Sequence, residues 1–490
     1  MSFSRLVLFV SLLAVFTMAT RFSADSDTWW HLRAGSWMVE ERRILDHDPF
    51  SLPRNGEPWV DHSWLAEIAL ALTHRAFGLP GLNLLTGLTV LLAFAFLWHA
   101  MEGVALLRGF VLLLAASTSA IYWSARPQIF SFALSAIFLW VLETARLRNR
   151  GRLWALPFLM LLWANLHAGF ALGFLLLLSY IVGALVEALL HRAQGADFSV
   201  IQGHLTWIAA LVFVGFACAL ATVVNPFGLR TLLLPLQTVS VGALRAYIEE
   251  WQSPDFHALQ SQPFLWLLFS TSGALAAARG AKRATEFVQV FGFAYLGFVA
   301  ARNVAMFALV AAPILARHGQ SILTQALARR SPSPPLPERM TRMLNVLILA
   351  LVSLLSLVKV AGPLSTEENE RIIREQVPVQ AAAFLREEGP PGPLFNSYNW
   401  GGYVLWSLYP KYRSFVDGRT DLFGDEILGE YLLAWRAGEG WERVLERWGI
   451  RLVLLEVDAP LATALRLSGW QELYRDPMAV VLSPPSRSVR

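Results

Sequence analysis

Long apolar runs separated by short polar stretches dominate the chain between residues 5 and 361. A helix needs about 20 predominantly apolar residues to cross a bilayer, so the pattern predicts about eleven spans. They lie near residues 5–21, 80–100, 104–123, 127–146, 152–166, 169–190, 204–224, 263–279, 284–300, 302–317 and 342–361. A signal peptide is the alternative for the first run. Because this run ends in Thr17-Met18-Ala19-Thr20-Arg21, a poor cleavage site, we expect an uncleaved span.

The composition agrees with a polytopic membrane protein. Of the 490 residues, 55% are hydrophobic and only 16% are charged, with a mean hydropathy of +0.47. A soluble domain carries about 25% charged residues. The net charge of +4 does not indicate nucleic-acid binding, because the arginines are scattered between apolar runs. The single cysteine, Cys218, lies in an apolar run and excludes an intrachain disulfide.

Arginine bias predicts the orientation. One set of loops holds most of the basic residues, and the positive-inside rule makes these loops cytoplasmic. This set contains Arg146, Arg148, Arg150, Arg152, Arg192, Arg279, Lys282, Arg283, Arg317, Arg329, Arg330, Arg339, Arg342 and the proline-rich linker Ser331–Pro337. The N-terminus is then cytoplasmic and the C-terminal part lies outside. The basic residues are almost all arginine, which suggests a GC-rich bacterium, so we expect a multi-pass protein of the bacterial cytoplasmic (inner) membrane.

Two domains are expected, a transmembrane domain over residues 1–361 and an extracytoplasmic α/β domain over 362–490. The first contains a large external loop, 22–79, with amphipathic helices, and a smaller external segment, 225–262. In the second, the apolar pattern predicts helices and short strands. The predicted helices are 379–386, 426–435 and 441–448, and the predicted strands are 394–395, 414–416, 452–456 and 479–482.

Unusual polar residues gather on the predicted exterior side. Ionisable groups at membrane depth are rare and usually line a cavity or a pathway. Their restriction to one side therefore predicts a single external site. The principal members are Asp25, Asp27, His31, Arg33, Asp48, Arg126, His167, Glu249, Glu250 and Arg302.

Several of these residues also have a structural interpretation. Asp27 can cap the helix that follows it, and this role is compatible with catalysis. Asp61 is a second candidate cap, before Ser63 and Trp64. Asp46-His47-Asp48 can ligate a divalent metal, although such clusters more often cap turns. The helical spacing of Trp30, Ala34, Trp37 and Met38 predicts a face that lies on the membrane.

The run Asp25-Ser26-Asp27-Thr28-Trp29-Trp30-His31-Leu32-Arg33 is similar to the acidic motif after the first span of C-type (GT-C superfold) glycosyltransferases, which use polyprenyl-phosphate sugars. Oligosaccharyltransferases carry an acid-x-acid-x-aromatic-aromatic-x-Leu-Arg run there. Protein O-mannosyltransferases and aminoarabinose lipid A transferases have an acidic pair in the same place. Stretches such as LWANLHAGF, ARPQIFSF, VVNPFGLR, NSYNWGGYVLWSLYP and FVDGRTDLFG resemble an uncharacterised group of bacterial membrane proteins near that superfold.

The resemblance implies roles for individual residues. Asp27, together with Asp25, corresponds to the base that activates the acceptor or to a metal ligand. The oligosaccharyltransferase motif helps to hold a divalent cation, so a metal held by Asp27 and Glu250 is implied. The nearest match to a second acidic pair is Glu249-Glu250. The acceptor-reading WWDYG-type motif has no counterpart here, which argues against a peptide asparagine as the acceptor.

The predicted function is an inverting glycosyltransferase that moves a sugar from a polyprenyl-phosphate carrier to an envelope acceptor at the outer face. Its chemistry needs a base and cations for the departing phosphate, which Arg126, His167, Arg302 and Arg33 are expected to supply. The sequence contains no convincing glycine-rich phosphate loop, which fits a reaction that needs no nucleotide cofactor. The alternatives are a catalytically silent protein of envelope assembly, or a lipid or solute transporter; a transporter is expected to contain internal repeats.

Acceptor contacts are expected from both extracytoplasmic parts. Asp48, Glu249 and Glu250 are the candidates outside the C-terminal domain. Within it, Asn396, Tyr398 and Asn399 precede paired glycines, and Asp417-Gly418-Arg419 predicts a turn after a short strand. Ends of strands are where α/β folds place ligand-binding groups. The alternative is that Asp417 and Arg419 pair only to hold that turn.

Overall fold

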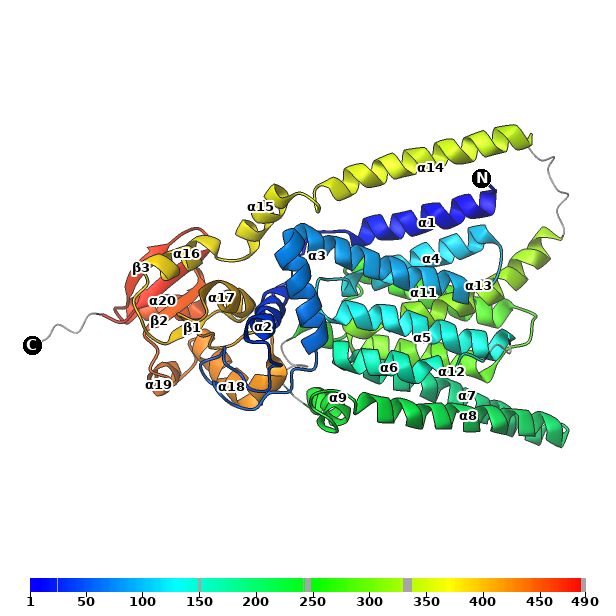
Figure 1. The fold of residues 1–490 in the computed structure, drawn as a ribbon, viewed down its shortest axis with the longest axis horizontal. Helices are drawn as coiled ribbons and strands as arrows, with labels where there is room; N and C mark the ends of the chain where they lie inside the picture. The colour runs from blue at the N-terminus through cyan, green and yellow to red at the C-terminus, as the bar shows by residue number, and fades with distance from the viewer. Residues whose placement is uncertain (24, 149–150, 241, 243–247, 329–336, 486–490) are drawn as a thin grey trace, which may run out of the picture.

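The computed structural model describes every residue except 24, 149–150, 241, 243–247, 329–336 and 486–490. A bundle of helices forms one end of the elongated molecule, and a smaller unit with a β-sheet forms the other (Figure 1). Three of the predicted cytoplasmic arginines (Arg150, Arg329 and Arg330) and most of the proline-rich linker lie outside the described residues.

Each predicted span coincides with a helix of the bundle. Seven of the described helices are long and apolar enough to cross a membrane, and three shorter apolar helices (α1, α6 and α12) lie among them. The number of spans that cross the bilayer therefore remains a prediction. The bundle consists of α1 (Phe3–Ala19), α3 (Trp64–Ala100), α4 (Ala105–Ser119), α5 (Gln128–Arg148), α6 (Ala155–Leu166), α7 (Ala171–Ala193), α8 (Phe198–Thr222), α11 (Gln262–Ala277), α12 (Ala284–Val299), α13 (Val304–Leu327) and α14 (Glu338–Ala361).

Helix α3 is longer than the predicted span because it has two arms. Gly78 has φ 62° and ψ −157°, a conformation that glycine adopts without the steric cost of a side chain. The helix therefore bends there, as Figure 1 shows. The arm that begins at Trp64 belongs to the predicted first external loop, and the arm that ends at Ala100 belongs to the bundle.

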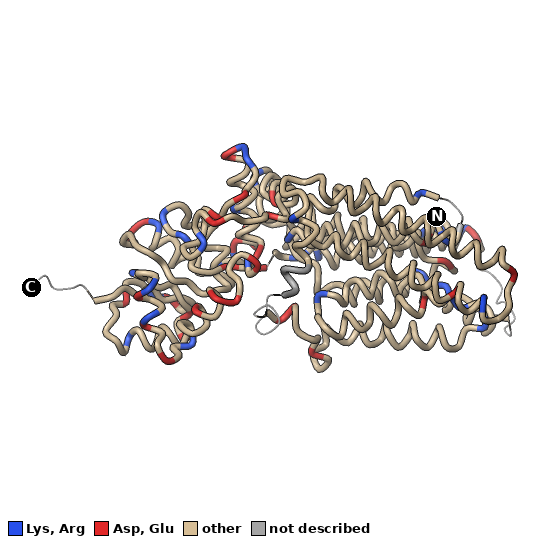
Figure 2. The backbone as a smooth tube through the Cα atoms, turned by 90° about the horizontal axis from the view of Figure 1, so that it is seen from below, with Lys and Arg blue, Asp and Glu red and all other residues tan. Residues whose placement is uncertain are grey.

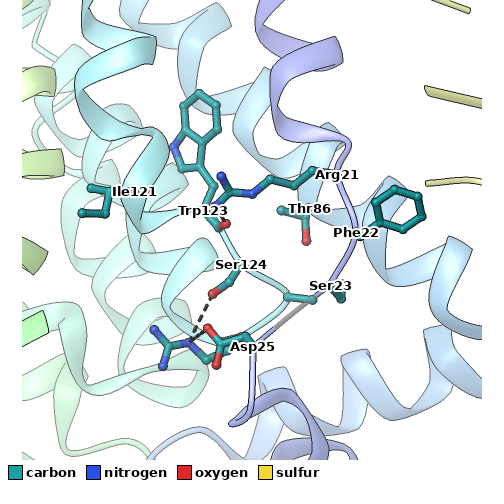
Figure 3. A pocket seen from close by; sticks show the side chains of 10 residues that line it. Arg21, Phe22, Ser23, Asp25, Thr86, Ile121, Trp123 and Ser124 are labelled. Atoms are coloured by element: carbon teal, nitrogen blue, oxygen red, sulfur yellow. Dashed lines mark hydrogen bonds and ion pairs between the residues drawn. The ribbon is translucent and has the colours of Figure 1, made fainter. Parts of the chain in front are cut away.

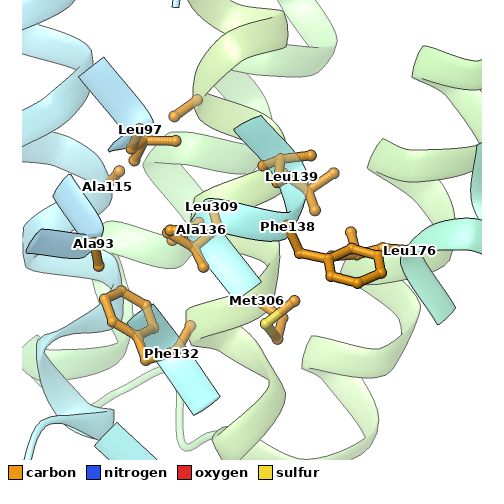
Figure 4. Packing of buried hydrophobic residues seen from close by; sticks show 14 of the residues in the cluster. Ala93, Leu97, Ala115, Phe132, Ala136, Phe138, Leu139, Leu176, Met306 and Leu309 are labelled. Carbon is orange, nitrogen blue, oxygen red and sulfur yellow. The ribbon is translucent and has the colours of Figure 1, made fainter. Parts of the chain in front are cut away.

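The core of the bundle lies around α13. Residues Val304–Ala316 of this helix are buried almost without exception, and they pack against α4, α5, α11 and α12. Figure 4 shows Leu309 among Leu97, Ala115 and Leu139 from three other helices. Large apolar side chains also cover the outside, for example Phe213 of α8, which is 73% exposed. Such a surface is expected where lipid is the solvent.

Charged residues are sparse along the middle of the bundle and more frequent at its ends (Figure 2). Toward the end away from the sheet, Arg317 donates to Glu143 (2.8 Å) and to Glu286, and His318 Nε2 lies 2.9 Å from Glu286. This buried ion cluster was not predicted from the sequence. Its charges are paired, as burial in an apolar environment requires.

The C-terminal unit contains a four-stranded sheet in the order β1-β2-β4-β3. Strands β1 (Leu394–Asn396) and β2 (Leu452–Glu456) are parallel, whereas β4 (Ala479–Ser483) is antiparallel to both β2 and β3 (Gln471–Arg475). The helices are α15 (Thr366–Gln376), α16 (Val379–Glu387), α17 (Gly401–Leu408), α18 (Thr420–Trp435), α19 (Trp441–Arg447) and α20 (Pro460–Leu467).

Two strand predictions differ from the structure. Residues 414–416 were predicted as a strand, but Ser414 forms only an isolated bridge with Ser51. The Asn396 side chain holds this segment instead, accepting from Phe415 N (2.7 Å) and donating to Val416 O (2.9 Å). Strand β3 was missed because its exposed, polar sequence QELYR lacks an apolar alternation.

Helix α2 (Thr28–Glu41) corrects another prediction. Its face with Trp30, Ala34 and Met38 was expected to lie on the membrane, but these residues are buried. They pack with apolar residues of the first loop and with Leu405 of α17. The apolar spacing therefore reflects burial between two parts of the protein, which a helical period alone cannot distinguish from burial in lipid.

A buried ion triad joins the first loop to the C-terminal unit. Arg419 donates to Asp48 Oδ1 (2.6 Å) and to Asp417 Oδ2 (2.7 Å), and all three side chains are fully buried. Nearby, Leu52 N donates to Ser414 O (2.7 Å). The first loop and the C-terminal unit therefore lie at the same end of the bundle.

Candidate active site

Asp27 lies at the start of α2 without capping it. The residue occupies the N-cap position, but its side chain forms no capping hydrogen bond. Its backbone N–H donates to Asp25 Oδ1 (3.0 Å), which fixes the turn between the two acids. The Asp27 carboxylate is therefore left to face another part of the chain.

That partner is Arg126, in the short loop between α4 and α5. Its guanidinium contacts three carboxylates: Asp25 (Nε, 2.9 Å), Asp27 (2.6 Å) and Glu250 (2.9 Å). Nε also lies 3.2 Å from Ser124 Oγ, and Figure 3 shows Asp25 and Ser124 converging at this point. Three segments distant in the sequence thus meet at one cation.

A second arginine stands behind Glu250. Arg302, in η5 (Ala301–Asn303), lies 3.7 Å from Glu250 Oε1, and its guanidinium stacks over the Trp251 ring at 4.3 Å from the centroid. Glu250 and Trp251 belong to η3 (Glu249–Trp251). Stacking holds the guanidinium plane, and Glu250 is its one ion-pair partner among the described residues, so its other N–H groups can donate to a ligand.

His167, between α6 and α7, is held in one tautomer. Its Nδ1 accepts from Gly169 N (3.0 Å) and lies 2.8 Å from Ser131 Oγ, which itself accepts from Trp163 Nε1 (2.7 Å). Burial lowers the pKa of His167 well below its ordinary value, and nearby positive groups lower it further. The neutral ring therefore carries its proton on Nε2 and is a hydrogen-bond donor there.

These groups line one cavity of about 370 Å³ between the bundle and the C-terminal unit. The wall includes Asp27, Trp30, His31, His62, Tyr122, Arg126, Gln128, His167, Glu250, Trp251, Arg302, Gly418, Thr420 and Asp421. A cavity of about 360 Å³ adjoins it at Arg126 and is also lined by Asp25 (Figure 3). Another of about 500 Å³ adjoins it at Glu250 and Arg302 and is also lined by Glu249.

The environment of Asp27 suits a base. Burial raises the pKa of Asp27 to about 6; Arg126 opposes this rise, and the negative charges of Asp25 and Glu250 add to it. The side chain remains 23% exposed. At neutral pH the carboxylate is mostly ionised and yet more basic than an ordinary aspartate, as general-base catalysis requires.

The turn of the C-terminal unit closes over this acid. A Cβ added at Gly418 would overlap Asp27 Oδ1, and it would lie 2.7 Å from Asp27 Cγ and 2.8 Å from Trp30 Nε1. Only a residue without a side chain allows the backbone to approach so closely. The turn predicted in the sequence therefore covers Asp27 with main chain.

The cavity wall also contains two histidines of the first external loop: His31, which was predicted at the site, and His62, to which no role was assigned. His31 Nδ1 lies 2.7 Å from Glu67 Oε1, and the His62 ring lies 5.7 Å from that of His167. Asp61 accepts from Ser63 N (3.1 Å), while Ser63 is the N-cap residue of α3. His31 lies within α2 and His62 stands just before α3, and the packing of these two helices brings both histidines to the cavity.

Five predicted site residues lie elsewhere. Arg33 pairs with Glu40 (3.1 Å) and stacks over Tyr409, away from the cavity. Glu249 lines only the neighbouring cavity of about 500 Å³. Asp48, Asp417 and Arg419 are buried in their ion triad, so none is placed to touch an acceptor. The structure thus contains the turn-holding pair that was the alternative for Asp417 and Arg419.

The carboxylates of the site do not fit the implied divalent metal. Asp25, Asp27 and Glu250 are the carboxylates that would bind it, but all three are already bound to the guanidinium of Arg126. Among the residues that the structure describes, no group of three or more His, Cys, Asp or Glu side chains is arranged to hold a metal ion. Arg126 therefore supplies the positive charge that balances this acidic group.

No protein-family model and no curated protein matches the sequence. Among solved structures, the oligosaccharyltransferase of Archaeoglobus fulgidus, tethered to an acceptor peptide, aligns with a TM-score of 0.59, 12% identity, and coverage of 93% of this chain and 70% of that one. The oligosaccharyltransferase AglB of the same organism, in complex with an inhibitory peptide and a dolichol-phosphate, aligns with a TM-score of 0.54 and 11% identity. The alignment covers 100% of this chain and 75% of that one. ArnT from Cupriavidus metallidurans, bound to undecaprenyl phosphate, aligns with a TM-score of 0.47 and 14% identity over 99% of each chain. The chain has the GT-C membrane fold that the acidic motif predicted.

Proposed function

We propose that the protein is an inverting glycosyltransferase that moves a sugar from a polyprenyl-phosphate carrier to an acceptor hydroxyl at the outer face of the membrane. The observation that carries this proposal is the convergence of Asp25, Asp27 and Glu250 on Arg126 beside an open cavity, in a GT-C fold. Neighbours of the same fold are described with a dolichol-phosphate or an acceptor peptide.

Asp27 is the base in this mechanism. The acceptor oxygen attacks the anomeric carbon from the face opposite the phosphate, and its proton passes to the Asp27 carboxylate. The bond between the anomeric carbon and the phosphate oxygen breaks, and the polyprenyl phosphate leaves with the electron pair. A single displacement of this kind inverts the configuration. Arg126 keeps the carboxylate oriented through its 2.6 Å contact.

Arg302 and His167 are the groups that stabilise the leaving phosphate. Arg302 contributes a full positive charge and is held by Trp251, and neutral His167 contributes its Nε2–H. Charge-assisted hydrogen bonds to phosphate are shorter and stronger than neutral ones. Donors that are already in place stabilise the charge that develops in the transition state without further reorganisation. Both side chains line the cavity that contains Asp27.

The test is transfer by the purified protein in nanodiscs. Undecaprenyl phosphates that carry different single sugars would be supplied together with envelope extract as the source of acceptor, and release of undecaprenyl phosphate would be followed by mass spectrometry. We expect turnover with at least one donor and a loss of about 10²- to 10⁴-fold in Asp27→Asn, the range for removal of a general base.

Glu40→Gln is the matched control, because this carboxylate lies on the same helix and pairs with Arg33 outside the cavity. Its turnover should match that of the unmodified protein. Equal turnover in Asp27→Asn and the unmodified protein would contradict the proposal. If transfer depends on Asp27, a comparison of envelope glycans by mass spectrometry, with and without the gene, would identify the sugar and the acceptor.

A further inference from the structure

A separate cavity of about 290 Å³ lies in the C-terminal unit at the carboxyl ends of two parallel strands. Ser397, Tyr398 and Asn399 follow β1 directly, and Glu456 is the last residue of β2. In α/β folds, ligands bind at the carboxyl ends of parallel strands because loops and helix starts leave a crevice there. The site of this cavity is therefore one where a ligand is expected.

Aromatic side chains form much of its wall. Tyr431 and Trp435 come from consecutive turns of α18, and Tyr398 faces them from the loop after β1, with ring centroids of the two tyrosines 6.3 Å apart. We call this cavity the aromatic pocket. Flat aromatic faces with polar edges bind ligands that present both C–H groups and hydroxyls.

Two buried polar atoms of the wall lack a partner. Glu456 Oε1 accepts from Ser397 Oγ (2.5 Å), but its Oε2 is buried and makes no hydrogen bond among the described residues. Trp435 Nε1, on α18, is likewise buried and has no acceptor among the residues that the structure describes. Buried polar groups are nearly always paired, so these two atoms are available to a ligand that fills the pocket. Such a ligand must donate to a carboxylate and accept from an indole N–H.

The charge of the wall narrows the choice. The wall contains both Glu456 and Arg436, whose opposite charges together do not select for an ionic ligand. Burial raises the pKa of Tyr398 well above its ordinary value, and the negative charges of Asp27 and Asp417 add to the rise. Tyr398 therefore keeps its phenol proton and adds no charge to the pocket. A hydroxyl group donates and accepts at once and carries no charge, so it matches both orphaned atoms.

The aromatic pocket and the catalytic cavity share a wall residue. Thr420, the first residue of α18, lines both of them. It follows the turn in which Gly418 covers Asp27. A ligand in the pocket could therefore extend one of its hydroxyls past Thr420 toward the proposed base.

We infer that the aromatic pocket binds a neutral saccharide that belongs to the acceptor. The inference rests on the proposed transfer reaction, and it assigns the acceptor to the carbohydrates. The sugar ring lies against Tyr398 and Tyr431. One hydroxyl bridges Glu456 Oε2, and another accepts from Trp435 Nε1. A free hydroxyl then points past Thr420 into the catalytic cavity.

Direct binding tests this without any transfer. The full-length protein in nanodiscs would be examined by saturation-transfer difference NMR with the methyl glycosides of glucose, galactose, mannose and N-acetylglucosamine, with inorganic phosphate as an anionic competitor. We expect at least one glycoside to bind and phosphate not to displace it. Glu456→Gln and Trp435→Phe should each weaken binding by about tenfold, because each removes one hydrogen bond to the ligand, the first at unchanged size and the second with an aromatic ring kept in place.

Trp470→Phe serves as the matched control, since this tryptophan packs in the same unit without lining the pocket. Its binding should be unchanged. Asp27→Asn should also bind the glycoside normally while transfer is lost, so failure of the reaction and failure of the pocket are distinguishable. No binding of any glycoside, displacement by phosphate, or equal binding in Glu456→Gln, Trp435→Phe and the unmodified protein would overturn the inference.

Discussion

Gly418 lies directly against the carboxylate of Asp27, with no room for a side chain between them. The two residues come from opposite ends of the sequence, one after the first span and one in the C-terminal unit. The contact makes the C-terminal unit part of the wall around the proposed base. It also fixes how far this unit can move from the bundle while the site stays assembled.

Gly418→Ala should therefore reduce transfer strongly. The added methyl group must displace Asp27 or the turn, and a displacement of about 1 Å costs on the order of 10²-fold in rate. The rate of transfer at saturating donor would measure this. Gly429→Ala is the control, because a Cβ at this position in α18 meets no atom within 4 Å. Similar rates for the two variants would contradict the close approach.

The rate should depend on pH through Asp27. A carboxylate with a pKa of about 6 is protonated below that pH and cannot accept a proton, so kcat/KM should rise as the pH passes 6 and then level off. Asp25→Asn removes a negative charge that raises the pKa of Asp27, so the rising limb should move to lower pH. A limb that stays in place in Asp25→Asn would contradict this coupling.

Removal of metal should leave transfer intact. Arg126 already neutralises the three carboxylates, so dialysis against EDTA should not lower the rate, and Mn²⁺ should show no tight binding by electron paramagnetic resonance. Arg126→Ala leaves the carboxylates without their cation, and this variant should bind Mn²⁺. Loss of transfer in EDTA with recovery on addition of Mn²⁺ would show that a metal displaces Arg126 during catalysis.

Arg419→Ala should destabilise the whole protein. It leaves Asp48 and Asp417 buried without a counter-charge, and breaking such a buried pair costs about 3–5 kcal/mol. Expression, donor binding and acceptor use should fall together. Arg371→Ala removes an exposed pair with Glu368 and should change the Tm little. Selective loss of acceptor use in Arg419→Ala would instead favour a direct role.

Arg302→Ala should weaken the use of the donor. Its guanidinium lines the catalytic cavity, and loss of one such donor costs about 10²- to 10³-fold in rate. Arg33→Ala should have a much smaller effect because Arg33 pairs with Glu40 outside the cavity. Both rates would be measured at a fixed concentration of the donor lipid. An equal loss in the two variants would restore the role in phosphate binding that the sequence suggested for Arg33.

Much of the fold was predictable because the membrane imposes length and hydropathy on its spans. Each apolar run became a helix, and the cluster of Asp27, Arg126, His167 and Arg302 followed from their common side in the predicted topology. A local sequence pattern cannot show which surface covers an apolar helix face. The stripe of Trp30 and its neighbours therefore suggested lipid, where the structure has α17.

Pairings between distant segments were also out of reach. Asp48 and Arg419 were both expected at a ligand, and only the folded chain reveals that they neutralise each other. Glu456 and Trp435 attracted no notice, since a carboxylate at the end of a short strand and a tryptophan on a helix are ordinary in a sequence. Their importance comes from the hydrogen bonds they lack, which is a property of the folded state.

The ion triad of Asp48, Asp417 and Arg419 has a consequence for biogenesis. A ribosome completes the first loop long before it reaches Arg419, so a growing chain carries Asp48 for most of its synthesis without the cation that permits its burial. In the folded chain this acid is neutralised where the C-terminal unit packs against the first loop. Assembly of the proposed site thus depends on residues that are synthesised late, because Arg419 and Gly418 both belong to the C-terminal unit.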